Sequence, residues 1–110
     1  MTRIDTSQLE VKEVREGWKG RFFQSQNLTF AYYTVEAGAS IHEHHHPNDE
    51  VWNVIEGQLE ITVAGVTELV GPGCAVIVPP GAAHSIRALA FTRAIVVDHP
   101  RRDAIGGIEL

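Results

Sequence analysis

The chain has 110 residues, of which 44% are hydrophobic and 21% charged, and its formal net charge is −5 at pH 7. These values are typical of one compact globular domain. The charges are scattered, so no basic surface for nucleic acid is expected, and no apolar run approaches the roughly 20 residues of a membrane span. A single cysteine, Cys74, excludes an intrachain disulfide, and the charged N-terminus is unlike a signal peptide, so we expect a cytoplasmic protein.

Residues 1–20 are charged and weakly patterned, with Val11 and Val14 as isolated apolar positions. We expect this N-terminal segment to form an extra edge strand, or a strand exchanged with a partner chain. Residues 21–110 are expected to form the single folded domain.

Six short segments rich in β-branched and aromatic residues predict strands, separated by Gly, Pro, Asn and Asp. They cover residues 28–35, 51–55, 58–65, 75–79, 84–90 and 92–98. No window carries a convincing 3.6-residue apolar period, so little or no helix is expected. Short strands at this spacing favour an antiparallel all-β sandwich or barrel.

Four histidines occur within five residues of the stretch "IHEHHHPNDE". If residues 41–46 form a strand, alternation places His42, His44 and His46 on one face. The Pro-Asn turn after them would bring Glu50 back beside the imidazoles. Nitrogen and oxygen ligands on one wall predict a site for a first-row divalent metal.

A second informative stretch is "GPGCAVIVPPGAAHSI", which begins at Gly71. Its Pro-Pro-Gly turn reverses the chain and delivers His84 at the start of another strand. Inward positions of a closed barrel converge on one interior, so His84 is a candidate further ligand from distant sequence.

Together these stretches resemble the two motifs of the cupins, G-x5-H-x-H-x3-4-E-x6-G and G-x5-P-x-G-x2-H-x3-N. Nine of the ten fixed positions agree: Gly38, His44, His46, Glu50 and Gly57, then Gly73, Pro79, Gly81 and His84. Only the closing Asn is replaced, by Ala88. The resemblance spans residues 38–88 and implies a cupin jelly-roll β-barrel of the small, single-domain, RmlC-like (cupin 2) type.

The resemblance also implies that His44, His46, Glu50 and His84 hold one divalent transition metal per chain, whether Fe, Mn, Ni, Zn or Cu. Such a donor set leaves positions where water, dioxygen or a substrate oxygen can bind. Family habit further implies a homodimer and a small-molecule ligand or substrate. An alternative ligand set with His42 and Asp49 would abandon the spacing of the motif glycines.

Other side chains are candidates to border the metal. Trp52 follows Glu50 by two residues and is expected to face the interior, and His42 would lie on the face of the ligands nearer the mouth. Either Tyr32 or Tyr33 must point inward, but the strand phase cannot be read from the sequence.

The segment "VVDHPRRD" resembles a shortened form of the tail of pectin-degradation-type cupins, which linearise unsaturated uronates. That resemblance implies Asp98 as an acid/base group and Arg101 as a carboxylate clamp, although the spacing between them is shorter than in the family pattern.

Two functions are compatible with these features. One is a metal-dependent enzyme, of isomerase, dioxygenase or sugar-acid processing type, acting on a small polar or anionic substrate. The other is a non-catalytic small-molecule-binding module, since the same barrel hosts both. An ionisable group in the pocket besides the four ligands would favour the enzyme.

Overall fold

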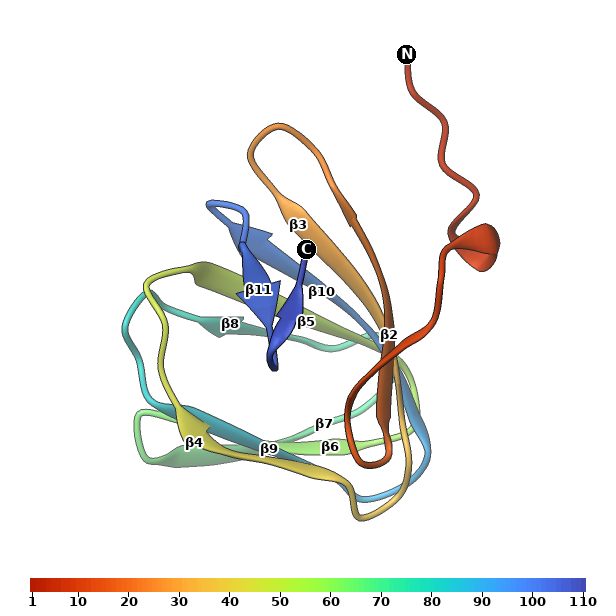
Figure 1. Ribbon diagram of the computed structural model, residues 1–110. Helices are drawn as coiled ribbons and strands as arrows, with labels where there is room; N and C mark the ends of the chain where they lie inside the picture. Colours follow the sequence, from red (N-terminus) through yellow and green to blue (C-terminus); the bar gives the residue numbers. More distant parts are fainter.

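Two antiparallel β-sheets face each other around a common interior (Figure 1). The structure is a computed structural model that describes all 110 residues. It confirms the predicted all-β jelly-roll barrel: its one helical element is the 3-10 turn η1 (Thr6–Gln8). It contains no helix that could serve as a membrane span.

The strands fall into a six-stranded sheet, a four-stranded sheet and a separate two-stranded hairpin. The six-stranded sheet has the order β1 (Lys12–Arg15), β2 (Trp18–Gln24), β3 (Thr29–Val35), β10 (Thr92–His99), β5 (Asp49–Glu56) and β8 (Ala75–Val78). The four-stranded sheet has the order β4 (Ser40–His44), β9 (His84–Ala88), β6 (Leu59–Val63) and β7 (Val66–Val70). The hairpin consists of β11 (Ala104–Ile105) and β12 (Ile108–Glu109).

All six segments predicted as strands are strands, because each alternates between a buried and an exposed face. Four observed strands were not predicted. In β2, Lys19, Gly20 and Arg21 interrupt the apolar pattern, and β7 is exposed except at Val70. The strands β11 and β12 have two residues each, which is too short for any period to be detected.

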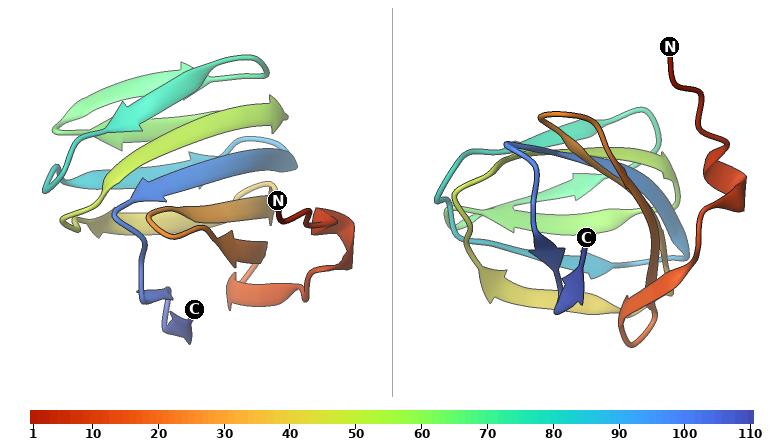
Figure 2. Two further views of the ribbon diagram at one scale, coloured as in Figure 1. Left: turned by 90° about the horizontal axis from the view of Figure 1, so that it is seen from above. Right: turned by 45° about the horizontal axis from the view of Figure 1, so that its top comes forward.

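The N-terminal segment contributes to the barrel rather than standing apart from it. The strand β1 lies at the edge of the six-stranded sheet and pairs with β2 of its own chain. Val14 and Trp18 are buried in the core, while the first ten residues run along the outside (Figure 2). Exchange of this strand with a partner chain stays a prediction.

The floor of the interior is an aromatic cluster. Trp18 contacts Tyr33 and Trp52 edge-on, at centroid distances of 5.8 and 6.0 Å, and Tyr33 stacks on Trp52 at 5.8 Å. Gly20 makes room for this cluster, because a Cβ there would lie 2.9 Å from the ring of Tyr33. Close ring packing restricts the rotamers of Tyr33 and Trp52. Both residues line one cavity together with His44 and His84.

Candidate metal centre

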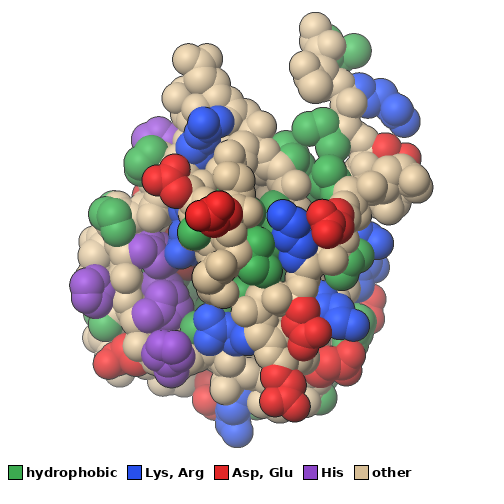
Figure 3. All heavy atoms as spheres, viewed as in Figure 1, with side chains coloured by type: hydrophobic (Ala, Val, Ile, Leu, Met, Phe, Trp, Pro, Cys, Tyr) green, Lys and Arg blue, Asp and Glu red, His purple; other side chains and the backbone are tan.

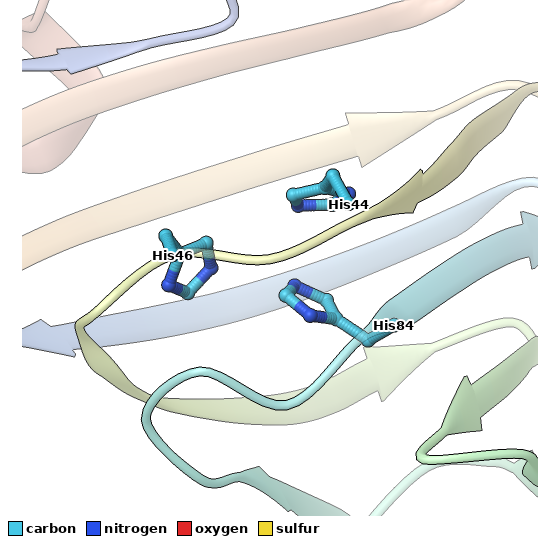
Figure 4. A group of neighbouring side chains, drawn as sticks. All are labelled: His44, His46 and His84. Carbon is cyan, nitrogen blue, oxygen red and sulfur yellow. The ribbon is translucent and has the colours of Figure 1, made fainter.

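Four side chains singled out by the sequence meet between the two sheets. His44 ends β4 and His84 begins β9, where the two neighbouring strands place them opposite each other. Glu50 comes from β5 of the other sheet, and His46 from the loop between β4 and β5. Figure 4 shows the three imidazoles turned toward one another, and their candidate ligand atoms all lie within 4.8 Å of each other.

The strand β4 does not keep a regular alternation across the histidines. Its register against β9 shifts between Ile41 and His44, so Ile41 packs against the core and the next two residues both face solvent. His42 is therefore exposed, with its ring 6.2 Å from that of His44. The prediction of a regular strand over residues 41–46 is wrong, because a bulge inserts an extra residue and reverses the alternation.

Backbone carbonyls orient two of the imidazoles. The Nδ1 of His44 lies 2.9 Å from the carbonyl of His42, and the Nδ1 of His84 lies 2.9 Å from the carbonyl of Ala82. A carbonyl only accepts hydrogen bonds, so each Nδ1 carries the proton and each Nε2 keeps its lone pair. This outer hydrogen bond is the usual arrangement around a metal-ligating histidine.

The carboxylate of Glu50 lies between the remaining ring nitrogens. Its Oε1 is 3.5 Å from Nε2 of His46, and its Oε2 is 3.3 Å from Nε2 of His84. Neither contact is a hydrogen bond: both ring nitrogens of His46 and the Nε2 of His84 are buried without a partner. Metal bonds of about 2.0–2.2 Å hold neighbouring ligand atoms about 3.0–3.6 Å apart. The residues therefore fit a divalent transition metal, which would satisfy these orphaned nitrogens.

The ionisable side chains of this cluster shift one another's pKa values. Burial alone would raise the pKa of Glu50, but the imidazoles of His46 and His84 hold it well below its usual range. Burial lowers the pKa of His44. Burial acts in the same direction on His84, but the neighbouring Glu50 outweighs it and raises the pKa of His84. The carboxylate thus favours positive charge at the imidazoles, in the place where a cation would bind.

Asp98 is a second buried carboxyl group beside Glu50. It lies on β10 directly opposite Glu50 on β5, and it is 1% exposed. In the metal-free protein, burial and the charge of Glu50 raise the pKa of Asp98 to about 8. Asp98, His46 and Glu50 form a second cluster of candidate ligand atoms.

Strand alternation places some of the aromatic candidates inside the barrel and one outside. Trp52 is buried, and its Nε1 donates a 2.9 Å hydrogen bond to Oε2 of Glu50. Tyr33 faces the interior and lines the cavity beside the metal centre, whereas Tyr32 faces outward and packs near Phe23. Burial, followed by the charges of Glu50 and Asp98, raises the pKa of Tyr33 far above its usual value, so its hydroxyl stays protonated.

Arg102, rather than its neighbour Arg101, reaches the centre. Its Nη1 lies 3.8 Å from Oε1 of Glu50, whereas Arg101 is exposed and directs its guanidinium toward the carbonyl of Ser25. The chain leaves β10 at His99, so strand alternation could not have distinguished the two arginines.

Arg15 of β1 also lines the cavity, although nothing in the sequence singled it out. On the face that bears the barrel mouth, histidines gather at one side with basic side chains nearby (Figure 3). Two guanidinium groups therefore border the cavity, and both were missed by sequence reasoning because their contacts arise only from the tertiary fold.

A family model described as "Cupin domain" matches residues 31–99. An uncharacterised protein from Streptomyces coelicolor is 31% identical over 99 residues, which cover 89% of this chain and 93% of the relative. The chain belongs to the cupin family.

Solved structures agree with this assignment at the level of the fold. KdgF from Halomonas sp. superposes with a TM-score of 0.88 at 23% identity, covering 94% of this chain and 96% of that protein. An RmlC-like cupin from Shewanella frigidimarina gives a TM-score of 0.86 at 24% identity, covering 91% of both chains.

The one departure from the cupin motifs lies away from the ligands. At Ala88 the backbone makes the strand-end contacts, because its N–H donates to the carbonyl of Ala39 and its carbonyl accepts from the N–H of Gly38. The end of β9 is therefore secured without the side chain of the motif Asn.

The raised pKa of Asp98 predicts a specific pH dependence of the metal-free cupin. Between its ordinary value near 3.8 and about 8, folded Asp98 keeps a proton that the unfolded chain has lost, so stability falls as pH rises through this window. In Asp98→Asn the neutral amide replaces the neutral acid and this contribution is absent. Urea titrations at pH 5.5 to 8.5 give the free energy of unfolding of both proteins. The value for Asp98→Asn minus the value for the wild type should therefore increase with pH. A difference that stays constant would contradict a raised pKa.

Proposed function

We propose that this cupin is a metal-dependent enzyme acting on a small anionic substrate, with His44, His46, Glu50 and His84 as the ligands of one transition metal. The observation that supports the proposal is the convergence of these side chains from two sheets, with three buried ring nitrogens that no protein group satisfies. Buried polar groups in proteins are almost always paired. A cation is the partner that this donor set suits, and Fe, Mn, Ni, Zn or Cu is each compatible with it.

Ionisable groups beside the ligands favour an enzyme over a binding module. Tyr33, Arg15 and Arg102 line the cavity, and the buried Asp98 lies on β10 opposite Glu50. A bound metal would act as a Lewis acid toward a substrate oxygen. The hydroxyl of Tyr33 supplies a proton donor next to that oxygen, and the arginines supply positive charge for a carboxylate.

Metal content tests the ligand assignment. Protein purified without immobilised-metal columns and reconstituted should hold about one ion per chain, because the centre provides one complete ligand set. Removing an outer hydrogen-bond partner of a ligand typically costs 10–100-fold in affinity, so His84→Ala should cost more than about 100-fold. Glu50→Gln should cost less than His84→Ala, since an amide oxygen still ligates. Elemental analysis and competition with a chromophoric chelator measure both.

Binding of the metal should also weaken as pH falls below roughly 6, because imidazoles must be neutral to ligate. The exposed His45 offers a matched control, so His45→Ala should leave both stoichiometry and pH dependence unchanged. Equal losses in His45→Ala and His84→Ala would refute the assignment.

The adjacent arginines provide a test of the anionic substrate. Arg102→Met removes the guanidinium 3.8 Å from Glu50, whereas Arg101→Met removes an exposed one. Loss of a charge-assisted contact is worth about 1.5–3 kcal/mol, so acetate should bind the cobalt-loaded Arg102→Met protein about 10- to 150-fold more weakly than the wild type. Arg101→Met should bind acetate like the wild type. The shift of the cobalt absorption bands on titration reports the affinity, and equal effects of the two substitutions would contradict a role for Arg102.

We also propose that the chain forms a homodimer through the outer face of the six-stranded sheet. On this face, five neighbouring strands each place one apolar residue opposite the next, which forms a row. The row consists of Ile77, Val51, Val97, Phe30 and Phe23. Ile77 is exposed and the other four residues are half-buried. A second copy packed on this row would bury the apolar surface that remains, because contiguous apolar surface marks interaction sites.

Sedimentation velocity checks the dimer. The wild type should sediment as a dimer and Ile77→Glu as a monomer, because the substitution places a charge in the apolar row. Val66 is exposed to a similar degree, 64% against 66%, but lies on the other sheet, so Val66→Glu should remain dimeric. A wild-type monomer, or identical behaviour of the two variants, would exclude this interface.

A further inference from the structure

The C-terminal hairpin lies across the mouth of the barrel. The strands β11 and β12 pair with each other and with neither barrel sheet, and Figures 1 and 2 both show them in front of the barrel interior. Ile105 and Gly106 line the same cavity as three of the four candidate ligands. The hairpin is therefore part of the wall around the metal centre.

The chain is firmly attached up to Arg102, just before this hairpin. The N–H of Arg102 donates a 2.8 Å hydrogen bond to Oγ1 of Thr29, and the carbonyl of Arg102 accepts a 2.6 Å bond from Nε2 of Gln24. Two residues earlier, the carbonyl of Pro100 accepts a 2.6 Å bond from Nδ2 of Asn48. These contacts hold Arg102 at the centre independently of the hairpin.

After Arg102 the chain forms no hydrogen bond with the barrel. Residues 103–110 make hydrogen bonds only among themselves, including the 2.8 Å bond from the N–H of Leu110 to the carbonyl of Asp103. The hairpin docks on the barrel by apolar contact alone: Ile105 is 6% exposed, and the Gly106 turn lies against Val14 of β1. Ile108 and Leu110 also pack against the core. Because no hydrogen bond joins the hairpin to the barrel, these apolar contacts are all that must be broken for it to open.

The docked hairpin leaves little room above the ligands. The cavity that it encloses measures about 80 Å³, whereas small-molecule sites are typically about 300–1,000 Å³. The docked cavity is therefore smaller than a usual small-molecule site, and displacement of Ile105 from its lining would enlarge it.

We propose that Ile105 is the specificity-determining residue of this centre, and that the hairpin pivots after Arg102 to admit anions larger than the docked cavity. The inference rests on the proposed metal site and deepens it, because it states which ligands reach the ion. Small carboxylates bind with the hairpin docked. Larger ones bind only the open form, so their apparent affinity depends on how often Ile105 is displaced.

A reversible crosslink tests the proposal directly. A Cβ on Gly106 would lie 3.7 Å from the Cβ of Val14, within the roughly 3.5–4.5 Å range of disulfides, and Val14→Cys removes the Cγ1 that this Cβ would overlap. Gly106 has a φ of +56°, so a cysteine there strains the backbone in both redox states, and the comparison is made between the two states of the same variant. The double variant Val14→Cys, Gly106→Cys, in a Cys74→Ser background, therefore locks the hairpin when oxidised and releases it when reduced. The probes are formate and benzoate, which offer the same carboxylate at different sizes to the cobalt-loaded protein.

Formate should bind the oxidised and reduced forms alike. Benzoate should bind the oxidised form at least about tenfold more weakly than the reduced form, because the open state is no longer populated. Equal benzoate affinity in the two redox states would overturn the proposal.

Two further variants keep the test independent of the crosslink. Ile105→Ala should strengthen benzoate binding relative to formate, whereas Ala104→Ser, at an exposed position of the same hairpin, should leave the ratio unchanged. The same ratio in Ile105→Ala as in Ala104→Ser would refute the role of Ile105. If the wild type takes up no cobalt, the metal centre itself is refuted and the inference falls with it. If cobalt binds normally and only the benzoate results fail, the hairpin proposal alone is wrong.

Discussion

A carboxylate enclosed by imidazoles in the interior of a small barrel is the constraint on which the rest of this structure depends. Glu50 is 4% exposed and His84 1% exposed, and the ring nitrogens around the carboxylate have no hydrogen-bond partner. Each unsatisfied buried polar group costs about 1–3 kcal/mol. A cation bound by these atoms would remove that cost, so ligand binding and folding would be thermodynamically linked.

Each of the two sheets supplies a different part of the candidate metal centre. The four-stranded sheet supplies His44 and His84, each oriented by a backbone carbonyl close in sequence. The six-stranded sheet supplies the acids, with Glu50 held by the indole of Trp52 and placed opposite Asp98. Because neither sheet has a complete set of donors, the geometry exists only when the sheets are packed face to face.

The edge strand β1 and the C-terminal segment meet at the mouth of the barrel. The edge strand β1 brings Arg15 and Val14 to one side, and the C-terminal segment brings Arg102 and Ile105 to the other. Two arginines and two apolar side chains thus border one cavity, although they come from elements that are far apart in the sequence. In the proposed function this charge would favour an anionic ligand, and the apolar contact between β1 and the hairpin would limit its size.

The sequence by itself determined the barrel and the four candidate ligands, because strand alternation and motif spacing are local properties. It also correctly expected Trp52 inside, two residues after Glu50. It could not distinguish Tyr33 from Tyr32, since a one-residue change of phase exchanges the two faces of a strand. It could not distinguish Arg102 from Arg101 either, because both follow the end of β10, where no strand period applies. The bulge in β4 and the docking of β11 and β12 were likewise decided by the tertiary structure. Both depend on pairing and packing with residues far away in the chain, which no local pattern records.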